Sequence, residues 1–210
     1  MRKIIGLTGT YCAGKNHVAA LLELRGLPSL DVDKLGHEAL ETKKEAVFAR
    51  FGGGLQTPDG KINRRLLGEK VFGKPEEMAA LEAIVHPAAN RLTYEWIAAQ
   101  NTSCVINAAL LHKSSAFDLL DFIILVNAPF FTRLWRARQR DRLSLPALLR
   151  RFASQKDFVP QYLSGKADIY RVENPGLFQR TGGDFESASR HFSADLASRI
   201  DEILSTEGIL

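Results

Sequence analysis

A glycine-bounded segment near the start of the chain carries the residue types that bind phosphate. An apolar run leads to Gly9, and four residues later Gly14 and Lys15 open a segment with helical spacing. Glycines let the backbone curl so that successive N–H groups point at phosphate oxygens, and the helix adds the positive end of its dipole. Lys15 can reach the outer phosphates as a point charge. The segment is therefore predicted to hold a nucleotide.

The residue after the lysine departs from the usual phosphate-binding pattern. A Ser or Thr normally stands there and its hydroxyl ligates Mg²⁺, whereas this chain has Asn16. Asn16 can offer its amide oxygen to Mg²⁺ directly or through water, but an amide is a weaker ligand than the usual hydroxyl. A glycine turn before a surface lysine is the alternative interpretation, but a strand before the loop and a helix after it favour phosphate binding.

Two carboxylates follow the second apolar run. Residues 27–30 have the pattern of a short strand, and Asp31 and Asp33 would share one side if that strand continued. A carboxylate there could accept the proton of a substrate hydroxyl, as phosphoryl transfer to an alcohol requires. Alternatively, one aspartate caps a helix and the other is solvated. The spacing does not decide between these interpretations.

Arginines are crowded into residues 133–151, and helical spacing places Arg133, Arg136 and Arg140 in one band. So many positive charges repel one another unless an anion is near. A solvated helix face is the simplest explanation of such a run. With a phosphate loop in the same chain, a lid that closes over transferring phosphates explains it better.

Alternating strand and helix patterns predict the architecture that positions these residues. Strands are expected over residues 2–8, 27–30, 104–111, 121–128 and 169–173. Helices are expected over residues 15–25, 34–51, 62–71, 75–84, 87–100, 146–155 and 187–204. A further helix is expected to begin at Pro129 and to carry most of the arginines. This alternation is typical of a mostly parallel sheet with both faces covered, and such sheets bind ligands beyond the carboxyl ends of their strands. Gly9, Asp33, Leu111 and Ala128 are expected along that edge.

Composition narrows the class of protein. The chain has 210 residues, of which 45% are apolar and 25% charged, as is ordinary for a globular protein. Its apolar runs are too short to span a bilayer, and the first one is interpreted as a buried strand and not as a signal peptide. Two cysteines fit a reduced compartment, so a cytoplasmic location is predicted. The net charge of +4 suits a polyanionic ligand and is weak evidence for nucleic acid, so no nucleic-acid or membrane partner is expected.

Short motifs in one order along residues 3–176 resemble the dephospho-CoA kinase family. They are Gly-Leu-Thr-Gly-x4-Gly-Lys at 6–15, Asp-x-Asp-x3-His at 31–37, Asp-Gly-x3-Arg-x2-Leu at 59–67, Leu-Glu-x-Ile-Val-His-Pro at 81–87, Arg-x3-Arg-Asp at 136–141 and Asn-x-Gly at 174–176. The resemblance implies an ATP-dependent kinase that phosphorylates the ribose 3′-hydroxyl of dephospho-coenzyme A, the last step of coenzyme A synthesis. It also implies an α/β, P-loop NTPase-type three-layer fold with a parallel five-stranded sheet, a helical substrate-binding region and a lid.

The resemblance also implies an organisation and a set of roles. A single domain, residues 1–210, would have its core at about 1–33, 102–135 and 167–210, a helical coenzyme-binding region at about 34–101 and a lid at about 136–166. Asp33 would be the catalytic base, with Asp31 beside it and with Lys15, Arg136 and Arg140 stabilising the transferring charge. Arg64 and His86 would contact the acceptor, although a His before Pro is more often structural. ATP would contact Gly9, Thr10, Tyr11, Cys12, Ala13, Gly14, Lys15, Asn16, His17, Asn174 and Gly176.

The departures from the family's pattern gather at the metal-binding edge. Asn16 and Asn107 stand where the family has a Ser and an acid, and Lys113 replaces a second acid. Asn16 and Asn107 are therefore only weak candidates for Mg²⁺ ligands, because hard cations prefer charged oxygens. Two hypotheses stay open: an active, divergent kinase, and a weak or inactive relative that binds nucleotide or coenzyme A as a sensor or interaction module. A kinase for another nucleoside or small alcohol fits residues 59–87 less well, and the sequence carries no signal for the oligomeric state.

Overall fold

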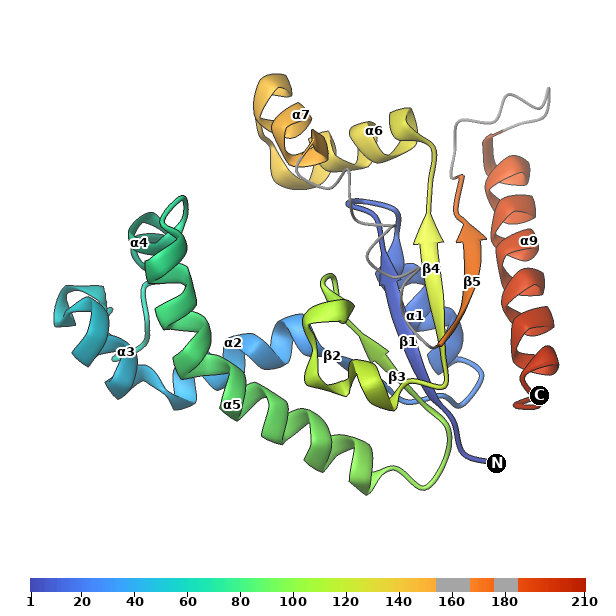
Figure 1. Cartoon of the computed structure of the whole chain (residues 1–210). Coiled ribbons are helices and arrows are strands. Elements are labelled where there is room, and N and C mark those ends of the chain that lie inside the picture. Colours follow the sequence, from blue (N-terminus) through green and yellow to red (C-terminus); the bar gives the residue numbers. More distant parts are fainter. Residues whose placement is uncertain (154–166, 176–184) are drawn as a thin grey trace. The chain divides into compact units, whose positions relative to one another are not determined.

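The computed structural model describes residues 1–153, 167–175 and 185–210 and divides the chain into two compact units. The first unit consists of Met1–Ser29 and Gln100–Leu210 and contains nearly all of a β-sheet with its flanking helices (Figure 1). The second unit, Leu30–Ala99, is mostly helical.

Five strands form the sheet, in the order β2-β3-β1-β4-β5. The neighbours β1 and β3, β1 and β4, and β4 and β5 all pair in parallel, and Leu7 in β1 lies in register with Asn107 and Ile124. The predicted α/β class with a parallel five-stranded sheet is thus confirmed. The strands are β1 (Ile4–Gly9), β2 (Ser29–Asp31), β3 (Cys104–Asn107), β4 (Phe122–Asn127) and β5 (Asp168–Glu173).

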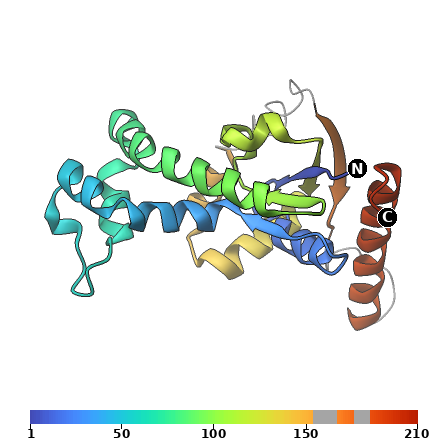
Figure 2. The same cartoon turned by 90° about the horizontal axis from the view of Figure 1, so that it is seen from below.

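Helices α1 (Lys15–Glu23) and α9 (Phe185–Thr206) pack on the same side of the sheet, because both contribute to one buried cluster. In that cluster Val18 of α1 and Ile200 of α9 meet Leu7 and Ile124 of the central strands. Figures 1 and 2 both show α9 beside β5 at the sheet's edge. The helices expected over residues 15–25 and 187–204 are thus present, and each buries an apolar stripe against the sheet.

Short 3₁₀ turns cover the other face of the central strand. They are η2 (Leu111–Lys113) and η3 (Ser115–Leu119). A Cβ added to Gly6 of β1 would lie 2.7 Å from side-chain atoms of Leu111 and Leu120, so these leucines pack directly onto the strand. The predicted strand over 104–111 is shorter than expected, because the chain leaves the sheet after Asn107 and Leu111 enters η2.

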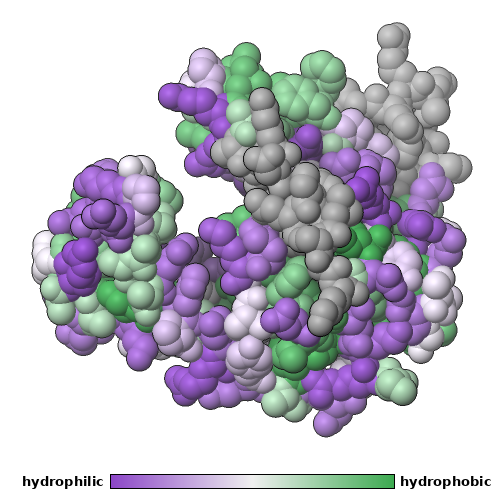
Figure 3. Space-filling model, viewed as in Figure 1, coloured by the Kyte–Doolittle hydropathy of each residue, from purple (hydrophilic) through white to green (hydrophobic). Residues whose placement is uncertain are grey.

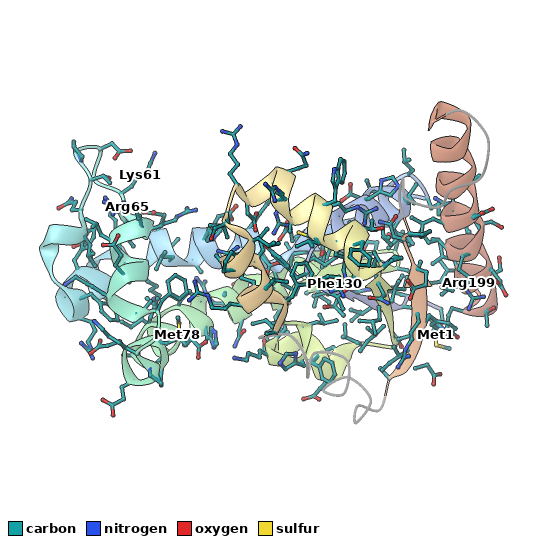
Figure 4. All side chains as sticks on the ribbon, turned by 90° about the horizontal axis from the view of Figure 1, so that it is seen from above. Met1, Lys61, Arg65, Met78, Phe130 and Arg199 are labelled. Carbon is teal, nitrogen blue, oxygen red and sulfur yellow. The ribbon has the colours of Figure 1, made fainter. Side chains whose placement is uncertain are left out.

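Two further helices follow β4 in the first unit. They are α6 (Phe130–Asp141), which begins after Pro129, and α7 (Leu145–Ala153). Figure 1 shows both beyond the carboxyl end of β4. Figure 3, the space-filling view, shows strongly hydrophilic and hydrophobic residues side by side in this part of the unit. Figure 4 labels Phe130 on α6 and Arg199 on α9. The arginine-rich run is thus helical, as predicted.

The second unit has its own apolar core. Val47, Leu55, Ile62 and Leu67 are buried there, and Met78 packs against them. Helices α2 and α5 lie side by side in both cartoon views (Figures 1 and 2). The elements are α2 (Val32–Thr42), α3 (Lys44–Phe51), η1 (Gly53–Leu55), α4 (Arg64–Val71) and α5 (Pro75–Ala99), and Figure 4 labels Lys61, Arg65 and Met78 on this unit.

Helix α5 corrects the prediction of two helices separated at His86-Pro87. It is continuous, with Pro87 inside it. A proline in a helix removes one backbone hydrogen bond and disfavours helical geometry in the residue before it. Burial overrides this local preference, because Ala88 and Ala89 pack with Ala39 of α2 immediately after the proline.

The expected helix over 34–51, by contrast, is divided. It consists of α2 and α3, which meet at Lys43. No helix among residues 1–153, 167–175 and 185–210 is both long and apolar enough to cross a membrane.

Candidate active site

The loop between β1 and α1 has the conformation of a phosphate cradle. Gly14 has φ +94°, a value that L side chains rarely adopt, and Cys12 is also left-handed at φ +60°. The Ala13 N–H donates to the Thr10 carbonyl at 2.9 Å, and the Thr10 N–H donates to the Val126 carbonyl of β4 at 3.1 Å. The loop is therefore curled on itself and anchored to the sheet, as the glycine spacing predicts.

Arg136 and Asn174 hold this loop from outside. The Arg136 Nη1 donates to the Ala13 carbonyl at 3.0 Å, and the Asn174 Nδ2 donates to the same oxygen at 2.8 Å. Arg136 also donates to the Asn174 side-chain oxygen at 3.3 Å. Burial lowers the pKa of Arg136 from its usual range. Arg136 of α6 and Asn174, which follows β5, are far apart in sequence but thus fix the same carbonyl of the loop.

A second group of polar residues gathers at the loop's tip. The Asp141 carboxylate accepts hydrogen bonds from Tyr11 in the loop, from Arg140 Nε at 2.7 Å, and from Arg151 Nη1 at 3.0 Å. The Arg140 guanidinium lies over the Tyr11 ring at 5.1 Å, and the Tyr11 ring meets Phe152 edge-on at 5.2 Å. Residues of α6 and α7 therefore contact the loop directly.

These contacts shift the ionisation of the group. The hydrogen bond from Arg140 holds the pKa of Asp141 below its usual range. Burial, followed by the hydrogen bond to Asp141, raises the pKa of Tyr11. Burial also raises the pKa of the Cys12 thiol, which keeps it protonated at neutral pH.

The carboxyl ends of two strands support the loop through a polar chain. The Thr10 hydroxyl donates to the Asn127 side-chain oxygen at 3.1 Å, and the Asn127 Nδ2 donates to Glu173 at 2.8 Å. Asn127 ends β4 and Glu173 ends β5. This chain extends the cradle along the sheet edge where ligands of parallel sheets bind.

The candidate metal ligands differ in their surroundings. Asn16 is exposed in the first turn of α1, whereas Asn107 ends β3 and is 3% exposed. The Asn107 Oδ1 is buried and accepts no hydrogen bond from the described residues. Such an unpaired acceptor fits a cation or its water ligand. Lys113 lies exposed in η2, and among the described residues no three His, Cys, Asp or Glu side chains form a metal-binding group.

The predicted acceptor-site residues belong to the second unit. Helix α2 begins at Val32, so Asp31 and Asp33 do not share one side of a continuing strand. The Asp31 carboxylate caps the helix by accepting from the Lys34 N–H at 3.1 Å, and Asp33 is exposed in the first turn. Arg64 is exposed at the start of α4, and His86 is exposed in α5.

Three residues around the loop carry no role that their sequence context predicts. Asp141 belongs to a motif without a role of its own, and Asn127 and Glu173 belong to no motif. The signal that could have found the last two is their position at the carboxyl ends of strands, and Asp141 lies next to a predicted functional arginine. The predicted contact at Gly176 and the lid residues 154–166 lie outside the described residues.

The phosphate loop joins the central strand of a parallel sheet to a helix, and the arginine-bearing helix α6 lies beside it. This arrangement defines a P-loop kinase. A family model described as dephospho-CoA kinase matches residues 3–163 of the chain. A dephospho-CoA kinase of Treponema pallidum is 34% identical over 218 residues, covering 99% of this chain and 96% of that protein.

Solved structures agree with this match. A crystal structure of a Thermus thermophilus protein has a TM-score of 0.68 and 32% identity, covering 93% of this chain and 98% of that one. A dephospho-CoA kinase of Campylobacter jejuni has a TM-score of 0.60 and 26% identity, covering 96% and 97%. The chain therefore belongs to the dephospho-CoA kinase family. The predicted family, kinase class and role in coenzyme A biosynthesis are confirmed, and ATP use belongs to this family.

Proposed function

We propose that the chain transfers the γ-phosphoryl group of ATP to the ribose 3′-hydroxyl of dephospho-coenzyme A, through the residues assigned below. The observation that carries the proposal is the phosphate loop, which is curled on itself and held at the Ala13 carbonyl by Arg136 and Asn174. A cradle that is ordered before its ligand arrives loses little entropy on binding. Such preorganisation suits phosphoryl transfer, in which positioning and electrostatic stabilisation supply most of the catalysis.

On the nucleotide side, the N–H groups of the loop and Lys15 bind the ATP phosphates. Asn174 lies at the loop, and with Gly176 it provides the contact proposed for the adenine end. Arg136 is half-buried and hydrogen-bonded to the loop, so its positive charge lies beside the loop and attracts the bound phosphates. Arg140 is exposed beside Tyr11 and supplies a positive charge for the transferring phosphoryl group.

On the acceptor side, Asp33 accepts the proton of the 3′-hydroxyl. Its exposure in the first turn of α2 leaves the carboxylate accessible to a substrate, whereas Asp31 holds the helix terminus that presents it. Arg64 and His86 are exposed on the same unit and provide polar contacts for the coenzyme moiety. The helical region at about 34–101 is thereby proposed as the acceptor-binding region, and residues 136–166 as the lid.

Mg²⁺ supplies charge neutralisation of the phosphates when it is bound with ATP. The unpaired Oδ1 of Asn107 and the amide of Asn16 are the protein groups that would hold it or its water ligands. Mg²⁺ keeps several waters in kinase sites and is bound largely through substrate phosphates. A site with two amides is consistent with that mode, with a weaker affinity than a carboxylate would give.

The second candidate function is that of a weak or inactive relative that binds nucleotide or coenzyme A as a sensor. The observation in its favour is the neutral Asn107 at the end of β3, where Lys113 follows in η2. An altered metal shell lowers phosphoryl transfer more surely than it abolishes ligand binding. A cytoplasmic location, with ATP and dephospho-coenzyme A as partners, is proposed for either case.

Turnover and binding measured on one preparation separate the two functions. The protein is incubated with ATP and dephospho-coenzyme A in Mg²⁺ and in Mn²⁺, and ADP release is followed with and without the acceptor. Isothermal titration calorimetry measures the binding of each ligand. Acceptor-dependent ADP release supports the kinase, whereas binding of ATP or coenzyme A without turnover in either metal supports the sensor.

A further inference from the structure

We propose that Asp141 is a positioning residue that orients Arg140 toward the phosphate loop. The inference rests on the proposed function and adds to it a carboxylate to which no role has been given. Asp141 is the last residue of α6 and follows Arg140 directly. Its side chain is 15% exposed, whereas that of Arg140 is 60% exposed, so a largely buried carboxylate contacts an exposed guanidinium.

The contact between the two side chains fixes the plane of the guanidinium. Arg140 Nε donates to Asp141 Oδ1 at 2.7 Å, and Arg140 Nη2 donates to Oδ2 at 3.4 Å. Two parallel contacts along one edge define an orientation as well as a distance. The opposite end of the guanidinium, at Nη1, is then directed away from the carboxylate and becomes the donor for a phosphoryl oxygen.

The face of the guanidinium is fixed by the loop itself. Its carbon lies 5.1 Å from the ring centre of Tyr11, and the Tyr11 hydroxyl donates to the same carboxylate that holds Arg140. A cation over an aromatic face is attracted by the ring's quadrupole. The Asp141 carboxylate therefore binds Arg140 and the loop residue Tyr11 at once, and so holds the arginine against the loop.

A third element joins this arrangement. Arg151 of α7 donates to Asp141 Oδ2 at 3.0 Å and to the Tyr11 hydroxyl at 3.4 Å. The loop, α6 and α7 thus meet at one carboxylate, with two guanidinium groups and one phenol around it. Two positive charges face one negative charge, so the cluster keeps a net positive charge beside the phosphate loop. Asp141 orders the arginines without cancelling their attraction for phosphate.

Ionisation supports this geometry. Arg140 holds the pKa of Asp141 below its usual range, which keeps the carboxylate charged at neutral pH. The raised pKa of Tyr11 keeps the phenol protonated, as a donor to that carboxylate must be. An Asn at position 141 would offer one acceptor and one donor, and the donor would face the N–H groups of the arginines.

A double-mutant cycle tests whether Asp141 acts through Arg140. Asp141→Asn, Arg140→Ala and the double variant are compared with the wild type in kcat and in KM for ATP. We expect Asp141→Asn to lower kcat about tenfold in the wild type, and less than about twofold in the Arg140→Ala background, because the arginine it orients is absent there. Asp195→Asn, the same substitution at an exposed position of α9, is expected to leave kcat unchanged.

Thermal unfolding of all variants checks that the comparison is made on folded protein. Two results would overturn the inference. One is an equal loss of kcat from Asp141→Asn in both backgrounds, which indicates a merely structural role. The other is tighter ATP binding and undiminished kcat in Asp141→Asn, which indicates that the carboxylate only competes with phosphate for the arginine.

The inference can also be tested by ATP binding, without turnover. If the wild type binds ATP but does not transfer phosphate, the proposed function fails, and the same four proteins are compared by calorimetry with ATP. Weaker ATP binding from Asp141→Asn in the wild-type background alone supports the positioning role. Equal effects in both backgrounds, or no effect in either, contradict it.

Discussion

The side-chain amide of Asn174 lies where a side chain on Gly14 would begin. An ideal Cβ on Gly14 would stand 2.3 Å from Asn174 Nδ2 and 3.5 Å from Arg136 Nη1. Real Cβ atoms essentially never approach another atom as closely as the first of these distances, and the φ of +94° adds backbone strain. The glycine before Lys15 is thus required for two reasons, its conformation and the space that the Asn174 amide takes.

Gly14→Ala is expected to lower ATP affinity by more than about tenfold, because the loop must move away from Asn174 or leave its left-handed conformation. Calorimetry with ATP measures this effect. Gly26→Ala is the matched control: Gly26 also has a left-handed φ of +77°, but a Cβ there meets nothing within 4 Å. ATP affinity unchanged in Gly14→Ala would contradict the argument from space.

Replacing Asn174 tests the hold on the loop. Asn174→Ala removes the donor to the Ala13 carbonyl, whereas Asn174→Asp places acceptor oxygens against that carbonyl. We expect both to weaken ATP binding, with Asp the worse by roughly threefold or more because it also adds negative charge beside the phosphates. An affinity for ATP in Asn174→Asp equal to that of Asn174→Ala would show that the contact does not hold the loop.

Asn107 offers a test of the metal argument. Its buried Oδ1 is without a partner in the described residues, so Asn107→Leu should raise the free energy of unfolding by about 1 kcal/mol while lowering turnover. Asn107→Asp, together with Asn16→Ser, should raise Mg²⁺-dependent turnover, because charged oxygens bind hard cations better. Urea unfolding and a Mg²⁺ titration of kcat measure the two effects. Turnover unaffected by the double replacement would mean that metal binding is not limiting.

Tyr170 is expected to make the free energy of unfolding depend on pH in the alkaline range. Its hydroxyl donates to Glu207, and this hydrogen bond raises the pKa of Tyr170 to about 12. The unfolded chain ionises its tyrosines near pH 10, so the folded state holds this proton more tightly between about pH 10 and 12. The corresponding stability is fully present below about pH 10 and is lost as pH rises through 12.

Tyr170→Phe is therefore expected to be less stable than the wild type at pH 9, by about 1 kcal/mol, and to lose less stability between pH 9 and pH 11.5. Urea unfolding followed by circular dichroism at the two pH values gives both quantities. Tyr94→Phe, at a tyrosine that is 43% exposed on α5, serves as the control. Parallel loss of stability in Tyr170→Phe and the wild type would contradict the assignment.

The sequence predicted the parts of the fold that follow from local patterns. The apolar runs predicted the central strands β1 and β4, and helical spacing predicted α1 and α9, because burial of apolar side chains decides both. The continuous helix through Pro87 could not be predicted, since it depends on packing between Ala88, Ala89 and Ala39, which are far apart in sequence. A local rule failed there because a tertiary contact outweighed it.

The site shows the same division. The loop and its lysine are a contiguous motif, and the structure has the loop in the predicted curled conformation. Other contacts of the site join residues that are, in most cases, more than a hundred positions apart. They are the hydrogen bonds of Arg136 and Asn174 to Ala13, and the cluster of Tyr11, Asp141 and Arg151. No spacing rule reaches across such distances. The catalytic role proposed for Asp33 and the acceptor contacts proposed for Arg64 and His86 stay predictions.

The most direct test of the account is the mass of the acceptor after incubation with ATP, Mg²⁺ and the protein. We predict that dephospho-coenzyme A gains one phosphoryl group, that the product is identical to coenzyme A and so carries the phosphate on the ribose 3′-oxygen, and that Lys15→Ala abolishes the gain. An acceptor of unchanged mass in the presence of both Mg²⁺ and Mn²⁺, with a protein that still binds ATP, would contradict the proposed phosphoryl transfer.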